Sequence, residues 1–323
     1  MRFVVLGDRQ DYHIIPYAQF NQLENCQYIA GVDSKSKTLN ILNRIHVSDR
    51  LLNGNLPFQQ VWFPLYYRQK TIQEKTCFIF FSRRYDVVKQ GYYEYLKKRH
   101  PTAKFVYIFQ DIIANHKMKN IPQLKQMFDL IISFDEFEAK RFQIAYFPLI
   151  YSKQNITDDI EKTIDVYFVG YAKDRHAQII ETYQQLKKLG LHVDFSVIGV
   201  ADSEKREYGI HYVPNVPYTQ NIDKIRQSKC ILEIMQGGGS SSTLRLSEAI
   251  AFETKLLTNS PTIRKNILFR REYIYPFSAA AEINDNFVSF LRVKGKKVNY
   301  KALQEIISPE RLMQFILQRC EGI

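Results

Sequence analysis

The chain has 323 residues, 45% of them apolar, which is enough for two domains of about 150 residues with a core each. Its four cysteines, at positions 26, 77, 230 and 320, include no Cys-x-x-Cys pair, which excludes the usual zinc-site and disulfide frameworks and favours a cytosolic protein. No apolar run approaches the roughly 20 residues of a membrane span, and the first one is too short for a signal peptide.

The net charge of +12 is unevenly distributed along the chain. Residues 1–155 carry a net charge of +9 and residues 156–323 carry +3. A basic surface suits contact with an anionic membrane, an anionic acceptor or nucleic acid, and the alternative is a set of solvated Lys and Arg side chains without such a role. The sequence leaves these readings open.

Apolar runs alternate with helix-like segments through the first half. Strands are predicted at residues 2–6, 27–32, 76–81, 104–109 and 130–133, and helices at residues 12–23, 87–99, 122–128 and 134–142. Residues 47–64 are rich in Asn, Gly, Pro and aromatic side chains, so we expect an irregular loop region there. The alternation predicts a mostly parallel sheet with helices on both faces.

Residues 148–161 are the best candidate for a linker, and the alternating pattern starts again after them. Strands are predicted at 164–169, 192–198, 210–213, 230–234, 255–258 and 273–275, and helices at 177–189, 219–227, 243–253, 284–292 and 308–319. We therefore predict an α/β fold of two Rossmann-like domains, residues 1–155 and 156–307, that face each other across a cleft. The helix in residues 308–323 would pack back on the first domain.

A Gly/Ser loop at residues 236–242 lies between a predicted buried strand and a predicted helix. Small residues let backbone N–H groups approach a ligand closely, and the helix directs its positive N-terminal end at the same space. This arrangement suits an anion, most simply a phosphate. The alternative is a flexible connector.

Several common nucleotide motifs are absent. No Gly-x-Gly-x-x-Gly follows a strand and no P-loop occurs, which weighs against dinucleotide cofactors and ATP hydrolysis. No Gly-x-Ser-x-Gly elbow is present, which removes the usual esterase reading. No Asp-x-Asp ends a strand, so we expect no metal and no cofactor, with protein cations and backbone amides holding any diphosphate.

Four stretches of the second half carry a family resemblance. They are DVYFVGYAKDR at 165–175, LGLHVDFSVIG at 189–199, VPYTQN at 216–221, and STLRLSEAIA at 242–251 followed by KLLT at 255–258. Together they resemble the donor-binding domain of the GT-B glycosyltransferases, particularly those of bacterial capsule, lipopolysaccharide and exopolysaccharide loci. The first half resembles the acceptor domain only in its alternating pattern.

The resemblance implies roles for individual residues. Glu248 stands where the family's helix glutamate binds the donor ribose, although it could also be an exposed helix carboxylate. Arg245 would clamp the diphosphate unless it pairs with a nearby acid, and Lys173 and Arg175 would neutralise the leaving group unless they are ordinary surface residues. The implied donor site comprises Lys173, Arg175, Val213, Tyr218, Gln236, Gly237, Gly238, Gly239, Ser240, Ser241, Ser242, Thr243, Arg245 and Glu248.

The sequence departs from the family at one position of this loop. Many retaining members have two glutamates eight residues apart, but Ser240 lies eight residues before Glu248, and Gln236 lies twelve before it. The sequence therefore does not indicate whether the anomeric configuration is retained or inverted.

An inverting enzyme also needs a general base on the acceptor side. Asp111 is the first choice because it follows a predicted strand, and His116, Asp8 and His13 are the other candidates. Asp111 could instead cap a turn, and the two histidines could be ordinary surface residues. The residues expected to bind the acceptor are Arg9, His13, Arg83 and Arg84.

We therefore expect a cytosolic, metal-independent glycosyltransferase that moves a sugar from a nucleotide-diphosphate sugar to a lipid-linked surface glycan. A peripheral position at the inner face of the membrane fits the basic first half. The alternatives are a nucleotide-sugar epimerase or polyol-phosphate transferase with the same fold, and a non-catalytic basic protein that binds nucleic acid or acidic glycan.

Overall fold

A computed structural model describes residues 1–7, 11–30, 36–46, 59–67, 75–116, 119–156, 160–205, 208–237, 243–293 and 298–322. At residues 11, 44, 46, 59, 60 and 83–90 only the backbone is described. The chain divides into two compact units, one formed by Met1–Pro148 with Pro309–Ile323 and the other by Leu149–Ser308. The last helix thus belongs to the first unit.

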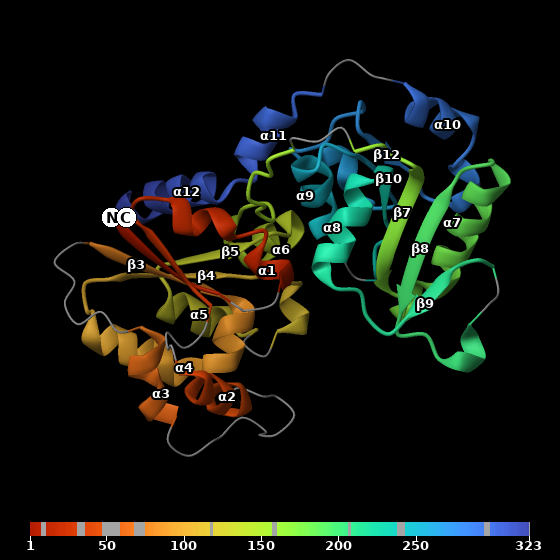
Figure 1. Cartoon of the computed structure of the whole chain (residues 1–323). Helices are drawn as coiled ribbons and strands as arrows, with labels where there is room; N and C mark the ends of the chain where they lie inside the picture. Colours follow the sequence, from red (N-terminus) through yellow and green to blue (C-terminus); the bar gives the residue numbers. More distant parts are fainter. Residues whose placement is uncertain are drawn as a thin grey trace. The chain divides into compact units, whose positions relative to one another are not determined.

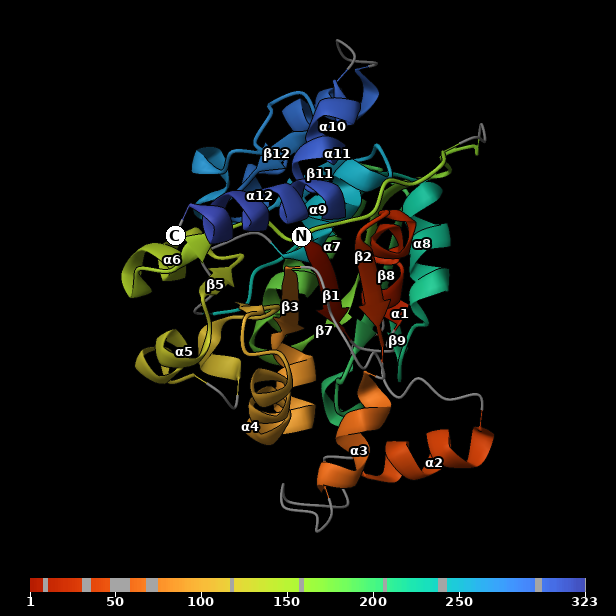
Figure 2. The same ribbon diagram turned by 90° about the vertical axis from the view of Figure 1, so that its left-hand side faces the viewer.

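The first unit contains a six-stranded parallel sheet. Its order is β2 (Cys26–Ile29), β1 (Arg2–Leu6), β3 (Thr76–Phe81), β4 (Lys104–Ile108), β5 (Leu130–Ser133) and β6 (Ala145–Tyr146). The helices are α1 (Asp11–Ile14), α2 (Lys37–His46), α3 (Gln59–Tyr66), α4 (Ser82–Arg99), α5 (Ile121–Met127), α6 (Glu136–Phe142) and α12 (Pro309–Glu321). Both views place α4 on one face of the sheet and α12 on the other (Figures 1 and 2).

The second unit contains another six-stranded parallel sheet. Its order is β12 (Ile274–Pro276), β11 (Lys255–Thr258), β10 (Ser228–Glu233), β7 (Ile164–Tyr171), β8 (Val193–Ile198) and β9 (His211–Val213). The helices are α7 (His176–Lys188), α8 (Tyr218–Arg226), α9 (Leu244–Ala251), α10 (Asp285–Arg292) and α11 (Tyr300–Ile306). The strand order reverses between β7 and β10, and ligands of open parallel sheets bind beyond the carboxyl ends of the strands at such a point.

The second sheet is buried on both faces. Along β7, Val166 and Phe168 belong to one apolar cluster and Tyr167 and Val169 to another. Figure 1 shows α7 and α10 on one side of the sheet and α8 and α9 on the other. Covered parallel strands are apolar on both faces, which is why their runs are continuous in the sequence. The predicted α/β fold class is confirmed.

Some predicted elements differ from the observed ones. The single helix expected at residues 12–23 is instead α1 followed by a 3-10 turn at Ala18–Gln22, with Pro16, which has no N–H to donate, between them. The expectation of an irregular region up to residue 64 is wrong for α3, which forms despite Pro64. Helix α4 begins at Ser82, five residues before the predicted start. Helices α2 and α11 and strand β6 were not predicted.

The segment that enters the second unit is held against α9. Ser247 Oγ donates a hydrogen bond to Leu149 O (2.6 Å), and Tyr151 N donates to Ile307 O (2.8 Å). The Tyr151 ring packs edge-on against Phe252, with 5.6 Å between ring centroids. These contacts bring Tyr151 to the helix that carries Arg245 and Glu248.

Helix α7 ends at a glycine with left-handed backbone. Gly190 has φ of 72°, and no heavy atom lies within 4 Å of the position a Cβ would take, so a substitution there strains the backbone alone. We expect Gly190→Ala to lower the free energy of unfolding by about 1–2 kcal/mol, measured by urea denaturation. Gly190→Asn should cost less because Asn tolerates this conformation. Equal losses in the two variants would contradict the backbone explanation.

Candidate functional site

The loops after β7 and β10 meet at the switch point of the second sheet. Lys173 Nζ donates a hydrogen bond to Gln236 Oε1 (3.0 Å). Gly237 N donates to Asp174 Oδ2 (2.9 Å), and a Cβ on Gly237 would lie only 2.8 Å from that oxygen. In each of these two hydrogen bonds the partners are 63 positions apart in the sequence, so only the fold brings the two loops together.

Lys173 adopts an unusual backbone conformation in the first of these loops. Its φ is 44°, in the left-handed region that costs a non-glycine residue about 1 kcal/mol or more. Its side chain is exposed. A glycine would be the better residue for this turn on stability alone, so the lysine side chain needs another explanation.

Arg175 is held by backbone carbonyl groups. Its Nε and Nη2 donate to Tyr171 O (3.2 and 3.1 Å), its Nη1 donates to Ile234 O, and its guanidinium lies over the Phe168 ring. Burial lowers its pKa, and the positive charge of Arg245 lowers it further. Arg175 thus joins the ends of β7 and β10 and brings positive charge to them.

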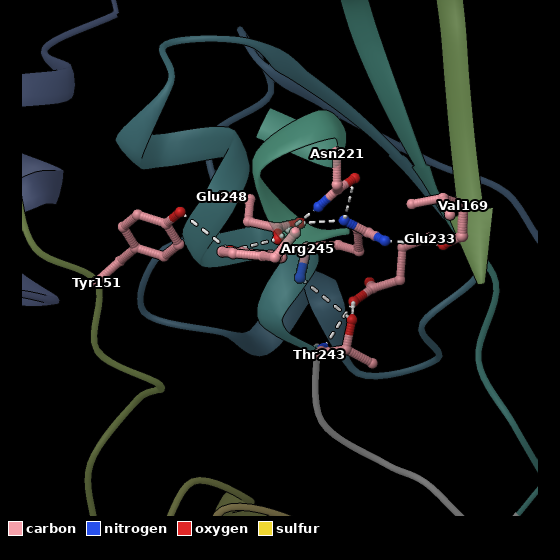
Figure 3. A network of polar contacts seen from close by, with 8 residues as sticks. Tyr151, Val169, Asn221, Glu233, Thr243, Arg245 and Glu248 are labelled. Atoms are coloured by element: carbon pink, nitrogen blue, oxygen red, sulfur yellow. Dashed lines mark hydrogen bonds and ion pairs between the residues drawn. The ribbon is translucent and has the colours of Figure 1, made fainter. Parts of the chain in front are cut away.

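A buried ion pair on α9 connects this helix to its neighbours (Figure 3). Arg245 Nη1 donates to Glu248 Oε2, and Arg245 Nη2 donates to Val169 O (2.7 Å) at the end of β7. Glu248 Oε1 accepts hydrogen bonds from Tyr218 OH (2.8 Å) and Asn221 Nδ2 (3.4 Å) on α8. The carboxylate is 1% exposed, so the alternative of an exposed helix carboxylate is wrong, whereas Arg245 does pair with a nearby acid.

Two tyrosines extend the network away from the sheet. The hydroxyls of Tyr151 and Tyr218 are 3.0 Å apart. Burial raises the pKa of each phenol, and the negative charge of Glu248 raises it further. Both therefore stay neutral and can donate hydrogen bonds. For Arg245, burial is the largest effect and lowers the pKa, but the electrostatic contributions of Glu248, Tyr167 and Tyr218 together outweigh it and the net shift is upward.

A second buried carboxylate holds the N-terminus of α9. Glu233, at the end of β10, is 2% exposed. Its Oε1 accepts from Thr243 N (2.6 Å) and Thr243 Oγ1 (2.8 Å), and its Oε2 accepts from Thr258 Oγ1 (2.5 Å) on β11. Thr243 is in turn the N-cap of α9, because its Oγ1 accepts from Arg245 N (3.3 Å). Glu233 therefore fixes the residue at which the Gly/Ser loop joins the helix (Figure 3).

The predicted donor residues that the structure describes divide into two groups. The group at the loops after β7 and β10 consists of Lys173, Arg175, Gln236 and Gly237. The group in the hydrogen-bond network of α8 and α9 consists of Thr243, Arg245, Glu248 and Tyr218. Val213 packs against the apolar cluster on the α9 side of the sheet. The other predicted residues, Gly238, Gly239, Ser240, Ser241 and Ser242, lie outside the described residues.

In the first unit, Asp111 caps the turn after β4. Its Oδ1 accepts from Ile112 N (2.8 Å) and its Oδ2 from Asn115 Nδ2 (3.1 Å), which is the capping role weighed as the alternative. His116 and His13 are 7% and 8% exposed, so the alternative of ordinary surface residues is wrong for both. Asp8 and Arg9 lie outside the described residues, and the side chains of Arg83 and Arg84 are not described.

A chain of contacts links His13 and His116 in the first unit. His116 Nε2 lies 3.4 Å from Ser82 Oγ, which accepts a hydrogen bond from Gln110 N (3.0 Å). Gln110 Nε2 donates to Tyr17 OH (2.9 Å), and the Tyr17 ring stacks on His13. The carboxyl ends of β3 and β4 are thereby connected to α1.

The sequence analysis missed several of these residues. Glu233 is an acid inside a run of apolar residues, next to the Gly/Ser loop, and that position was the available signal. Asn221 lies within a stretch that carried the family resemblance but was given no role. Tyr151 and Ser82 had no signal, because their roles depend on contacts across 67 and 34 positions of the chain.

The described residues contain no group of three or more His, Cys, Asp or Glu side chains that could hold a metal ion. In the same part of the chain, no helix is both long and apolar enough to cross a membrane.

The buried Arg245–Glu248 pair gives a prediction about stability. Removing one partner strands a buried charge, so Arg245→Met and Glu248→Gln should each lower the free energy of unfolding by about 3–5 kcal/mol. The double variant should lose less than the sum of the two. The more exposed pair Lys224–Asp194 (2.8 Å) is the control, and its variants should cost about 0–1 kcal/mol. Additive losses at Arg245 and Glu248, measured by chemical denaturation, would exclude a coupled pair.

No family model and no curated protein matches the sequence. Among solved structures, a glycosyltransferase from Rickettsia africae aligns with a TM-score of 0.56 and 12% sequence identity, covering 98% of this chain and 97% of the other. Spinosyn forosaminyltransferase aligns with a TM-score of 0.47 and 10% identity, covering 98% and 99%. The DNA-modifying β-glucosyltransferase aligns with a TM-score of 0.42 and 14% identity, covering 99% and 96%. The chain has the α/β fold of two Rossmann-like units that is found in GT-B glycosyltransferases.

Proposed function

We propose that the chain is a glycosyltransferase that moves a sugar from a nucleotide-diphosphate sugar to an acceptor hydroxyl. One observation carries this proposal: the loops after β7 and β10 bring Lys173, Arg175 and the N-terminal end of α9 to the switch point of the second sheet. Parallel sheets bind phosphate-containing ligands at this place. The second unit would hold the donor and the first unit the acceptor.

The diphosphate would bind beside Lys173 and Arg175. Lys173 Nζ is exposed, and its hydrogen bond to Gln236 can be exchanged for one to a phosphate oxygen. As the bond from the sugar to the phosphate breaks, negative charge develops on the leaving diphosphate. A lysine held beside that charge stabilises it without any metal ion.

The donor ribose would bind at Glu248. Its carboxylate already accepts hydrogen bonds from Tyr218 and Asn221, so ribose hydroxyls would replace these two donors at Oε1. The bond from Arg245 to Oε2 can remain during this exchange. Ribose recognition thereby requires the side chains on α8 to move, and not those on α9.

On the acceptor side, we propose His116 as the general base ahead of Asp111. Both carboxylate oxygens of Asp111 are engaged in capping the turn. The ring of His116 lies at the carboxyl ends of β3 and β4 and contacts the hydroxyl of Ser82. An imidazole nitrogen that carries no hydrogen can take a proton from an acceptor hydroxyl, and because His116 Nε2 faces the carbonyl oxygen Asp111 O (3.1 Å), that nitrogen would be Nδ1.

The acceptor that we propose is a lipid-linked glycan of the bacterial surface, and the basic first half would favour a peripheral position at the anionic inner face of the membrane. The resemblance to glycosyltransferases of capsule and lipopolysaccharide loci supports this acceptor class. A nucleotide-sugar epimerase is the alternative with the same fold, and it would isomerise the donor in the absence of any acceptor.

The substitution Lys173→Gly distinguishes a role of Lys173 in donor binding from a role in the stability of the fold. The variant should be as stable as the parent or about 1 kcal/mol more stable, because glycine accepts the left-handed backbone. It should bind sugar nucleotides about tenfold more weakly, since one charge-assisted hydrogen bond is lost. Both quantities can be measured by chemical denaturation and by calorimetric titration with UDP- and GDP-sugars.

Gln143→Gly is the matched control for this experiment. Gln143 has φ of 52° at the end of α6 in the first unit and is exposed. The control should gain the same stability and keep the affinity of the parent. Parent-like affinity in Lys173→Gly would remove Lys173 from the donor site.

A further inference from the structure

Glu233 lies among the groups that would receive the diphosphate. Its Oε1 accepts hydrogen bonds from the backbone N–H and the hydroxyl of Thr243. The backbone amide at the start of α9 is therefore already hydrogen-bonded to a carboxylate of the protein. Helix N-termini favour anions at this position. An incoming phosphate would therefore meet a negative charge where it needs a donor.

The charged side chains that form the described hydrogen bonds of this site comprise as many cations as carboxylates. The cations are Lys173, Arg175 and Arg245, and the carboxylates are Asp174, Glu233 and Glu248. A diphosphate adds negative charge to this balanced set. Its binding is favoured if one of the three carboxylates becomes neutral, because like charges in a partly buried site repel strongly.

Of the three carboxylates, Glu233 is best placed to become neutral. Glu248 already has a cation as its partner, Arg245, and Asp174 is exposed to water. Glu233 is buried, and the partners that it hydrogen-bonds in the described part of the chain are two hydroxyls and one amide. Among the described residues, no cation forms an ion pair with Glu233, and Arg245 acts on it only through its electric field.

We propose that Glu233 takes up one proton from solvent when a diphosphate donor binds at the switch point. This inference rests on the proposed function and adds a pH dependence to donor binding. The proton would sit on Oε2 and form a hydrogen bond to Thr258 Oγ1, whose own hydroxyl hydrogen would rotate away from Glu233. The two lone pairs of Thr258 Oγ1 can accept this bond together with the existing one from Ser260 N (3.0 Å). Oε1 remains the acceptor for Thr243, so the N-terminus of α9 stays in place.

The electrostatic surroundings of Glu233 agree with this assignment. Burial raises its pKa, and the hydrogen bonds from Thr258 and Thr243 offset only part of that shift. The charged groups that face it are Arg245 on α9, which lowers its pKa, and Arg175 in the turn after β7. The element on its other side, β11, presents the neutral hydroxyl of Thr258. A bound diphosphate would raise the pKa of Glu233 further.

Calorimetric titration with UDP-glucose and GDP-mannose tests the proposal. The diphosphate of a sugar nucleotide lacks the terminal phosphate that titrates near pH 6, so the ligand itself takes up no proton between pH 6 and 8.5. Repeating the titration in buffers of different ionisation heats measures proton uptake directly. We expect up to one proton per bound donor, and a dissociation constant that rises by up to about tenfold per pH unit once free Glu233 ionises.

Glu233→Gln is the diagnostic variant. It should bind the donor without the proton uptake seen in the parent, and its affinity at pH 8.5 should equal or exceed that of the parent. Glu138→Gln is the matched control, since burial also raises the pKa of Glu138 but this residue lies in the first unit. The control should keep the proton uptake.

The outcomes separate this inference from the proposed function. Donor binding by the parent with no proton uptake, or uptake that persists in Glu233→Gln, overturns the inference and leaves the glycosyltransferase proposal standing. Absence of binding by the parent to any sugar nucleotide at every pH overturns both. The buffer dependence of the parent is decisive even if Glu233→Gln does not fold.

Discussion

The second unit depends on the guanidinium of Arg245. It joins α9 to β7 through Val169 O, to α8 through Asn221, and to the carboxylate of Glu248 one helical turn away. A buried charge needs such partners because water no longer solvates it, and each partner comes from a different element. The position of α9 is therefore set by electrostatics as well as by apolar packing. Any ligand that engages Arg245 or Glu248 must work within this arrangement.

The strand order explains why charged residues collect where they do. Because the order of the second sheet reverses at β7 and β10, the loops after these strands have no crossover helix between them. Lys173, Asp174, Gln236 and Gly237 fill the opening with hydrogen bonds across it. The first sheet reverses between β1 and β3 in the same way. Next to that point, Ser82, which directly follows β3, meets Gln110 and His116, which follow β4.

Most strands of the two sheets could be predicted from the sequence, because parallel strands covered on both faces are short continuous apolar runs. Helix α9 was predicted from Thr243 and the pattern after it. Helix α2 was missed although Ile41, Leu42 and Ile45 recur at helical spacing, and in the structure these three apolar side chains are exposed. Helix α3 was missed because Pro64 and its aromatic neighbours favour a loop locally, and Phe63 and Tyr66 pack into the core instead.

The sequence by itself determined the α/β class, the Gly/Ser loop before α9, and the candidates Arg245 and Glu248, because these follow from local patterns and from a family resemblance. Only the tertiary structure decided what these residues contact. Glu248 accepts hydrogen bonds across 27 and 30 positions of the chain, and Glu233 reaches Thr258 across 25. Hydrogen bonds are short-ranged and directional, so residues far apart in the sequence become partners only when the sheet places their strand ends side by side. The role of Glu233 could be recognised only once that placement was known.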